Sequence, residues 1–389
     1  MTALPQLDRT AQNGRWAISA LFFANGSITG GWAPQIPLLM PRHSITETTL
    51  GLIILFFGVG AIAAMVGAGR LIATYGSRNV ARAFALALMP MLPFVVLAPN
   101  LAVLAVVVAL LGGFMGAMDV AMNANGVGVE ARLNKAAMSS FHGFWSLGAF
   151  VGAGIGGWVV AQTNALTGAL LSSGVGLAIL LIALPYVIED DSRKPADDTP
   201  HDALIPRDLG LVLLGLVALF SMIPEGAVMD WAAIYLQKEL GAAQAVSTLA
   251  FAFFAATMAI MRFAGDAVRN RFGAVRTLRG SAIIAAVGLA LAIAAPTAPL
   301  AIAGFAFAGI GIANMVPIAF SAAGNYPGYA QGTGIAFVAM LGYMGILVAP
   351  FSIGFVAEHF GFRSTFGGLL VLLIIVAIMA NRARHAERS

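Results

Sequence analysis

Three acidic residues interrupt otherwise apolar stretches of this sequence. Asp119 lies in the stretch 101–125, and Glu225 and Asp230 lie in the stretch 208–236. An ionisable group in such a stretch is costly unless it has a buried partner, a proton or a function. No lysine or arginine falls in the middle of an apolar stretch, so no basic partner is expected. Desolvation favours the uncharged form of a carboxyl group. We therefore predict that Asp119 and Glu225 are proton-coupling residues, poised to gain and lose a proton; the alternative is a neutral acid that only hydrogen-bonds to a neighbouring helix.

The composition is that of a protein embedded in a bilayer. Hydrophobic residues make up 60% of the 389 residues and charged residues 10%, whereas soluble domains have about 25% charged residues. A helix needs about 20 apolar residues to cross the bilayer core. We predict an all-α membrane protein whose twelve transmembrane helices are 15–41, 48–69, 80–98, 101–125, 137–160, 164–188, 208–236, 245–264, 276–295, 299–322, 332–356 and 363–381.

The distribution of positive charge predicts the orientation of these helices. If the N-terminus is cytoplasmic, only Arg42, Lys238 and Arg363 of the 21 lysines and arginines lie in outward loops. Because the others then lie on the inner side, both termini are predicted to be cytoplasmic.

The two halves of the chain repeat one another. The segment "YGSRNVAR" (75–82) matches "FGAVRTLR" (272–279), and "GWAPQIP" (31–37) matches "DWAAIYL" (230–236). In the same way "GAMD" (116–119) matches "GIAN" (311–314), so Asn314 is the counterpart of Asp119. We predict an N-terminal six-helix half (1–188), a cytoplasmic linker (189–207) and a C-terminal six-helix half (208–389), a parallel repeat of the kind found in two-domain transporters.

A loop motif follows the second predicted helix. The segment "GRLIATYGSR" (69–78) keeps the glycines and one arginine of the pattern Gly-x3-Asp-Arg-x-Gly-Arg-Arg, with Ala73 in place of the aspartate. Its second copy, "RFAGDAVRNRFG" (262–273), has a more complete set of charges. Together with the twelve helices and the repeat, this motif resembles the major facilitator superfamily over essentially the whole chain.

Three further stretches resemble one branch of that family. They are "MDVAMNANGVGVE" (118–130), "SSFHGFWSLGAFVGA" (139–153) and "EGAVMDWAAIYL" (225–236), and the branch is the fucose-permease-like one, with MosC-like bacterial proteins. The resemblance implies alternating access in the bacterial inner membrane and a loop that latches a gate. The latch residues that it implies are Gly69, Arg70, Gly76, Arg78, Arg262, Asp266, Arg271 and Gly273. Anchoring by positive charge is the alternative explanation of these arginines.

The resemblance also implies that helices one, four, seven and ten line a central cavity. Beside the two proton-coupling candidates these helices carry Asn25, Trp32, Gln35, Asn123, Asp230, Trp231, Tyr235 and Asn314, which we predict to bind substrate. Amide, carboxylate and aromatic groups together suit a sugar or polyol. For the two tryptophans, packing is the alternative to stacking on a ligand ring.

Three residues outside these helices are further candidates for substrate binding, namely His142, Trp145 and Tyr343. For His142 an interior histidine with satisfied hydrogen bonds and a proton relay are both alternatives. The nearby segment "GAFVGAGIGG" (148–157) resembles the helix-five motif of drug–proton antiporters, with Ala153 where those proteins have proline. Close packing through small residues is sufficient to explain its glycines.

These patterns predict a proton-coupled symporter of a small polar solute, such as a sugar, a polyol or an amino-sugar-like compound. The alternatives are a proton-coupled antiporter of a cationic or amphipathic drug-like compound and a membrane sensor without flux. The sequence has no cysteine, phosphate-binding loop, catalytic-triad spacing or metal cluster, so neither enzyme activity nor a cofactor is expected. The expected partners are the solute, protons and the lipid bilayer; nucleic acid is not expected, and the protein is predicted to be a monomer.

Overall fold

The computed structural model describes residues 9–32, 35–45, 47–189, 208–242, 246 and 249–387. These residues form helices and turns, with no strand among them. The chain divides into two compact units, Met1–Leu204 with Pro327–Ala336, and Ile205–Tyr326 with Phe337–Ser389. The prediction placed residues 327–336 in the C-terminal half, whereas in the structure they group with the first unit. Apart from Glu189, the predicted linker lies outside the described residues.

The helices follow the predicted segments closely. Those before the linker are α1 (Arg9–Trp32), α2 (Ile36–His43), α3 (Glu47–Tyr75), α4 (Ser77–Leu88), α5 (Met91–Leu97), α6 (Leu101–Leu133), α7 (Met138–Gln162), α8 (Ala165–Ala183) and η2 (Leu184–Tyr186). Those after it are α9 (Leu209–Leu240), α11 (Leu249–Phe272), α12 (Ala274–Ala294), α13 (Ala298–Ile312), α14 (Met315–Gly324), α15 (Gln331–Met379) and η4 (Ala380–Ala386).

Within the described residues, eight helical stretches are long and apolar enough to cross a membrane. The other four predicted segments fall on α1, α7, α11 and the first part of α15. The last two segments are joined as α15, but Gly361 separates them because its backbone is not helical (φ 80°, ψ 160°). The all-α membrane fold predicted from hydropathy is therefore confirmed.

Local chemistry sets several helix boundaries. Asparagine side chains accept a hydrogen bond from the backbone N–H three residues on, at Asn100 before α6 (3.0 Å) and at Asn164 before α8 (2.9 Å); such caps satisfy N–H groups that a helix start leaves unpaired. The third predicted segment is split between α4 and α5 at Pro90, because proline has no N–H to continue the helical ladder.

The predicted repeat is visible in the turn between the second and third helices of each half. Gly76 precedes α4 with φ 80° and ψ 150°, and Gly273 precedes α12 with φ 83° and ψ 162°. Positive φ of this kind is strained for side chains with a Cβ atom. The shared glycine is therefore required by the same turn in both halves.

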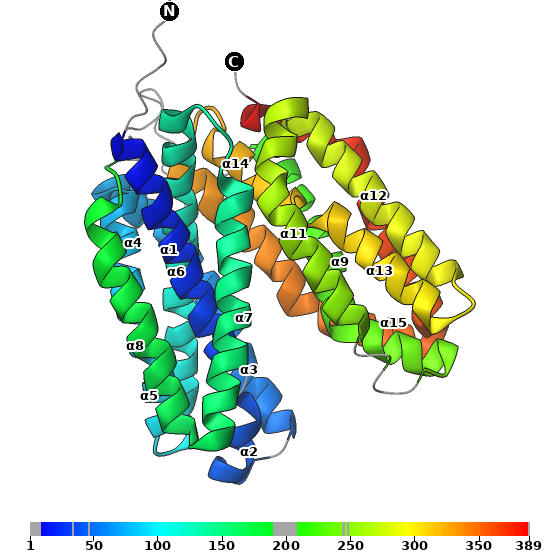
Figure 1. Cartoon of the computed structure of the whole chain (residues 1–389), viewed down its shortest axis with the longest axis horizontal. Helices are drawn as coiled ribbons and strands as arrows, with labels where there is room; N and C mark the ends of the chain where they lie inside the picture. Colours follow the sequence, from blue (N-terminus) through cyan, green and yellow to red (C-terminus); the bar gives the residue numbers. More distant parts are fainter. Residues whose placement is uncertain are drawn as a thin grey trace, which may run out of the picture. The chain divides into compact units, whose positions relative to one another are not determined.

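Glycines bring α1 and α7 into backbone contact, and the two helices run side by side in Figure 1. A Cβ atom added to Gly148 would lie 2.1 Å from the carbonyl oxygen of Phe23, and one added to Gly152 would lie 2.2 Å from that of Ser27. On the facing helix, a Cβ atom on Gly26 would lie 2.1 Å from the carbonyl oxygen of Trp145. Close packing thus accounts for Gly148 and Gly152 of the segment 148–157, as it does for small residues in membrane helices generally.

We expect Gly148→Ala to lower the stability of the detergent-solubilised protein by about 1–3 kcal/mol, because the new methyl group forces two backbones apart. Gly174→Ala is the matched control, since nothing lies within 4 Å of a Cβ atom there. Both variants replace a helical glycine, so the same gain in helix propensity applies to each. Equal midpoints of thermal unfolding for the two variants would contradict this packing account.

Candidate functional site

A chain of polar side chains crosses from α6 to α7 around Asp119. The Nδ2 group of Asn123 donates to the backbone oxygen of Asp119 at 2.8 Å and to its carboxylate Oδ1 at 3.2 Å. The Oδ1 atom of Asn123 lies 3.2 Å from Nε2 of His142 on α7. Asp119 is 6% exposed and Asn123 is fully buried. The structure thus joins three residues that the sequence analysis proposed separately, as an acid, an amide and a histidine.

The glycines on the same side of α6 have a different neighbour. A Cβ atom on Gly112 would lie 2.0 Å from the carbonyl oxygen of Phe57, and one on Gly116 would lie 3.0 Å from that of Ala61, both on α3. This stripe of α6, from Gly112 to Asn123, therefore serves helix packing as well as the polar chain.

A second pair of polar residues joins α1 to α7. The indole Nε1 of Trp145 donates to Oδ1 of Asn25 at 2.9 Å, and Nδ2 of Asn25 approaches the backbone oxygen of Met115 on α6 at 3.5 Å. Asn25 is 1% exposed, so both ends of its amide are used within the protein. These bonds fix α1, α6 and α7 to one another beside the Asp119 chain.

The remaining predicted residues of helix one lie at its far end. Trp32 is the last residue of α1 and is 7% exposed. Gln35 follows α1, and its Nε2 donates to the backbone oxygen of Ala165 at the start of α8 (3.1 Å). That bond connects the segment after α1 to the start of α8.

In the second unit, Glu225 on α9 has a basic partner. The Nη2 group of Arg262 lies 2.9 Å from Oε1 of Glu225, and the two side chains are 6% and 18% exposed. The prediction that no base lies near the intramembrane acids was therefore wrong for Glu225. The error arose because Arg262, two residues before the predicted helix end at 264, was assigned to the loop, whereas α11 continues to Phe272 and Arg262 lies well inside it. The same holds for Asp266, which is 6% exposed on α11 and was predicted to be part of a loop.

The counterpart of Asp119 lies at a break in a helix. Residues Ala313 and Asn314 separate α13 from α14, and Pro317 explains the break because it offers no N–H to the carbonyl of Ala313. At the corresponding place of the repeat, Met122 keeps its N–H and α6 is continuous. The two halves thus differ in helix geometry as well as in charge at this position.

The side chain of Asn314 fits against a glycine of α11. Asn314 is fully buried, and its Nδ2 donates to the backbone oxygen of Met261 at 3.4 Å. Among the described residues no donor reaches its Oδ1, which lies 1.9 Å from where a Cβ atom of Gly265 would be. Only glycine leaves room for this amide.

We expect Gly265→Ala to destabilise the protein by about 1–3 kcal/mol, because the buried amide of Asn314 has to move. The double variant Gly265→Ala/Asn314→Ala removes the clash and should unfold at a higher temperature than Gly265→Ala alone. Gly280→Ala on α12, where nothing lies within 4 Å, is the control. A double variant less stable than the single one would contradict the contact.

Two aromatic residues of α9 pack inside the second unit. The Tyr235 ring is fully buried against the rings of Phe305 (5.8 Å) and Phe366 (5.4 Å), and its hydroxyl donates to the backbone oxygen of Ala292 at 2.9 Å. The ring of Tyr235 is thus packed in an aromatic cluster of its own unit, and its role in substrate binding stays a prediction. The ring of Trp231 lies 5.9 Å from that of Phe362.

The other predicted residues of this unit add little to the site. Asp230 is on α9, but its side chain lies outside the described residues. Tyr343 is a half-buried residue of α15, next to Gly342, which packs on α9 at Met222.

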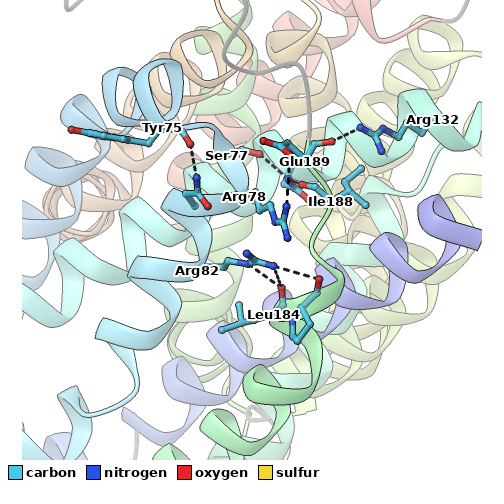
Figure 2. A network of polar contacts seen from close by, with 11 residues as sticks. Tyr75, Ser77, Arg78, Arg82, Arg132, Leu184, Ile188 and Glu189 are labelled. Carbon is cyan, nitrogen blue, oxygen red and sulfur yellow. Dashed lines mark hydrogen bonds and ion pairs between the residues drawn. The ribbon is translucent and has the colours of Figure 1, made fainter.

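Of the predicted latch residues of the first half, Arg78 belongs to a polar network that lies after the end of α8 (Figure 2). Gly69 is buried and Arg70 exposed near the end of α3. Arg78 forms a largely exposed pair with Glu189 at 3.8 Å, a geometry that contributes little stability. Arg271 of the second half is exposed next to Gly273.

Backbone oxygens hold this network together, and sequence reasoning missed the residues that reach them. Arg82 donates through Nε to the oxygen of Leu184 at 2.9 Å, and Asn125 donates to the oxygen of Ile188 at 3.0 Å. Arg132 donates to the backbone oxygen of Glu189. The repeat offered one signal for Arg82, because it matches Arg82 with Arg279. Arg279 likewise bonds the last helix of its half, η4, through the side-chain oxygen of Asn381 (2.9 Å).

Comparison with known proteins decides the family. The model of the Major Facilitator Superfamily matches residues 16–223 and 214–389. The chain belongs to the Major Facilitator Superfamily. An uncharacterized MFS-type transporter of Yersinia pestis is 34% identical over 92% of this chain and 93% of that protein. Membrane protein MosC of Rhizobium meliloti is 30% identical over 93% of this chain and 87% of its own.

Solved structures of this superfamily share the fold. FucP in the outward conformation has a TM-score of 0.82 at 16% identity, with 98% of this chain and 100% of that chain covered. FucP is the E. coli fucose:proton symporter. Sequence identity at this level shows the common fold alone. The predicted superfamily is confirmed by the family model and by the relatives, which include MosC.

Proposed function

We propose that this protein symports a small polar solute with protons through the bacterial inner membrane by alternating access. The observation that carries the proposal is the buried chain Asp119–Asn123–His142, which places a carboxylate and an imidazole on one hydrogen-bonded path. Both groups can gain and lose a proton near neutral pH when their surroundings are arranged for it. Ionisable groups of this kind inside membrane helices are typical of proton pathways.

The ion pair of Glu225 supports a choice between the two proton-coupling candidates. Glu225 already has a basic partner within its own unit, because Nη2 of Arg262 lies 2.9 Å from its Oε1. We therefore propose the Asp119 chain as the coupling site and a structural role for Glu225.

The solute is proposed to be a sugar, a polyol or an amino-sugar-like compound. Amide and aromatic side chains predominate among the candidate residues, as is usual where uncharged polar ligands bind. The fold relative FucP is a fucose:proton symporter. In this proposal both termini are cytoplasmic, the protein acts as a monomer in the bilayer, and it needs neither catalysis, cofactor nor nucleic acid.

Proton movement in proteoliposomes loaded with a pH-sensitive dye tests the proposal. Fucose, xylose and panels of polyols and amino sugars are added outside, without an imposed gradient. A symported solute acidifies the interior, whereas a solute exchanged for protons makes it alkaline. Alkaline shifts with cationic amphipathic compounds, and none with the sugar and polyol panels, would support antiport in place of this proposal.

A further inference from the structure

The amide of Asn123 has only one orientation that its neighbours allow. One end of the amide lies 2.8 Å from the backbone oxygen of Asp119. A backbone carbonyl oxygen accepts hydrogen bonds and cannot donate them. The NH2 end of the amide must therefore face Asp119, and the oxygen end faces His142.

This orientation fixes the tautomer of His142. The amide oxygen of Asn123 accepts hydrogen bonds, so Nε2 of His142, at 3.2 Å, carries a hydrogen. A second proton then binds the other ring nitrogen, Nδ1, and converts the neutral ring to an imidazolium. No other covalent bond changes, and release of the proton restores the neutral ring.

The amide dipole favours one distribution of charge. Its NH2 end points at the Asp119 carboxylate, 3.2 Å from Oδ1, and its oxygen points at the imidazole. A donor facing an anion and an acceptor facing a cation both form charge-assisted hydrogen bonds, which are stronger than neutral ones. The observed polarity therefore stabilises a carboxylate at Asp119 together with an imidazolium at His142.

Among the other charged and titratable groups on the packed helices, Glu130 of α6 faces the start of α7. Its Oε1 accepts from the backbone N–H groups of Ala137 (2.8 Å) and Met138 (3.1 Å), and Met138 is four residues before His142, about 6 Å by helical rise. Arg15 is seven residues before Phe22, whose ring is 5.0 Å from that of His142. α8 carries none of these groups between Ala165 and Ala183. Arg82 lies within α4, where its Nε donates to the backbone oxygen of Leu184 at 2.9 Å. The rest lie near helix ends: Arg9 on α1, Glu47, Arg70 and Tyr75 on α3, Arg78 on α4, Arg132 on α6 and Tyr186 in η2.

We propose that His142 holds the transported proton, on Nδ1, and that Asp119 remains ionised as its counter-ion through the amide of Asn123. The assignment rests on the proposed function, because it names the atom that takes the coupled proton. It differs from the simpler assumption that the Asp119 carboxyl itself is protonated. Asp119 and Asn123 are then positioning residues, and His142 is the proton carrier.

Nitrogen NMR of the full-length protein in lipid nanodiscs, without any solute, tests the assignment. The five histidines are labelled with nitrogen-15, and His142→Gln identifies the signals of His142. Between about pH 8 and pH 5, the range in which histidine titrates, we expect Nε2 to stay protonated and Nδ1 to gain a proton. In Asp119→Asn and in Asn123→Leu the proton affinity of His142 should fall about tenfold or more, because the counter-ion is lost or disconnected. His359→Gln, an exposed histidine on α15, is the matched control and should leave the His142 signals unchanged.

Two results would overturn the assignment. One is a His142 ring that stays neutral over this range in the wild-type protein, and the other is the same titration in wild type, Asp119→Asn and Asn123→Leu. If His142 titrates as expected but no proton moves with a solute, the proposed function fails and the proton-binding pair stands. If protons move with the solute while His142 stays neutral, only the assignment of the proton carrier fails.

Discussion

Replacing Asp119 with asparagine should reduce proton-driven accumulation of the solute to simple equilibration. With one proton per solute, a pH difference of one unit is worth about 1.4 kcal/mol and supports an accumulation of about tenfold. Without the carboxylate, the chain through Asn123 loses its negative charge, and binding of a proton is no longer linked to the transport cycle. The accumulation ratio of labelled solute in proteoliposomes should therefore fall from about ten to about one.

Exchange of labelled for unlabelled solute separates this effect from loss of the protein. Because exchange needs no net proton movement, Asp119→Asn should retain it while accumulation is lost. Asp190→Asn, in the predicted linker, is the matched control and should accumulate like wild type. Accumulation in Asp119→Asn at the wild-type ratio would remove Asp119 from the coupling mechanism.

Replacing Arg262 with methionine should destabilise the protein by about 3–5 kcal/mol, because Glu225 is left without its partner. The two side chains are 6% and 18% exposed, and their atoms lie 2.9 Å apart, so the remaining carboxylate has little access to water. We expect the double variant Arg262→Met/Glu225→Gln to recover most of this loss, since it leaves no buried charge. Thermal unfolding of the four proteins in detergent gives the required double-mutant cycle.

The cycle also tests the roles of the two acids. If Glu225 is structural, Glu225→Gln should retain accumulation driven by the proton gradient, unlike Asp119→Asn. Strict additivity of the two substitutions in the cycle would show that the pair contributes no coupling energy. That outcome would contradict the account of Glu225 given above.

The architecture was readable from the sequence because membrane helices are defined by hydropathy and length. The turn glycines Gly76 and Gly273 were found through the repeat, and their backbone conformations agree. The superfamily was predicted from patterns of the same kind, spread over the whole chain, and the match to the family model confirmed it.

The site was less predictable, because contacts between helices depend on where each helix ends and which face it turns inward. The pair of Glu225 with Arg262 was missed since charged residues near a predicted end were assigned to the loop. Tyr235 was predicted as a ligand contact, and the sequence did not indicate that its ring packs in an aromatic cluster and its hydroxyl bonds a backbone oxygen. Polarity within a span therefore identified buried residues without distinguishing structural from functional ones.

For the polar chain of Asp119, Asn123 and His142, the sequence indicated functional candidates but not which of them are in contact. Asp119 and Asn123 share a face of α6 by their spacing of four residues, which sequence alone indicates. That His142 of α7 meets the same amide follows only from the packing of α6 and α7. Its part in the site could be proposed from its residue type, but its partner could not.

Accumulation of labelled solute by the wild-type protein under an imposed proton gradient tests the central claim most directly. With an acidic exterior and a more alkaline interior, we predict that the solute found in the dye assay accumulates above its external concentration, and that collapse of the gradient releases it. Equilibration without accumulation, or accumulation only when the interior is the acidic side, would contradict proton symport.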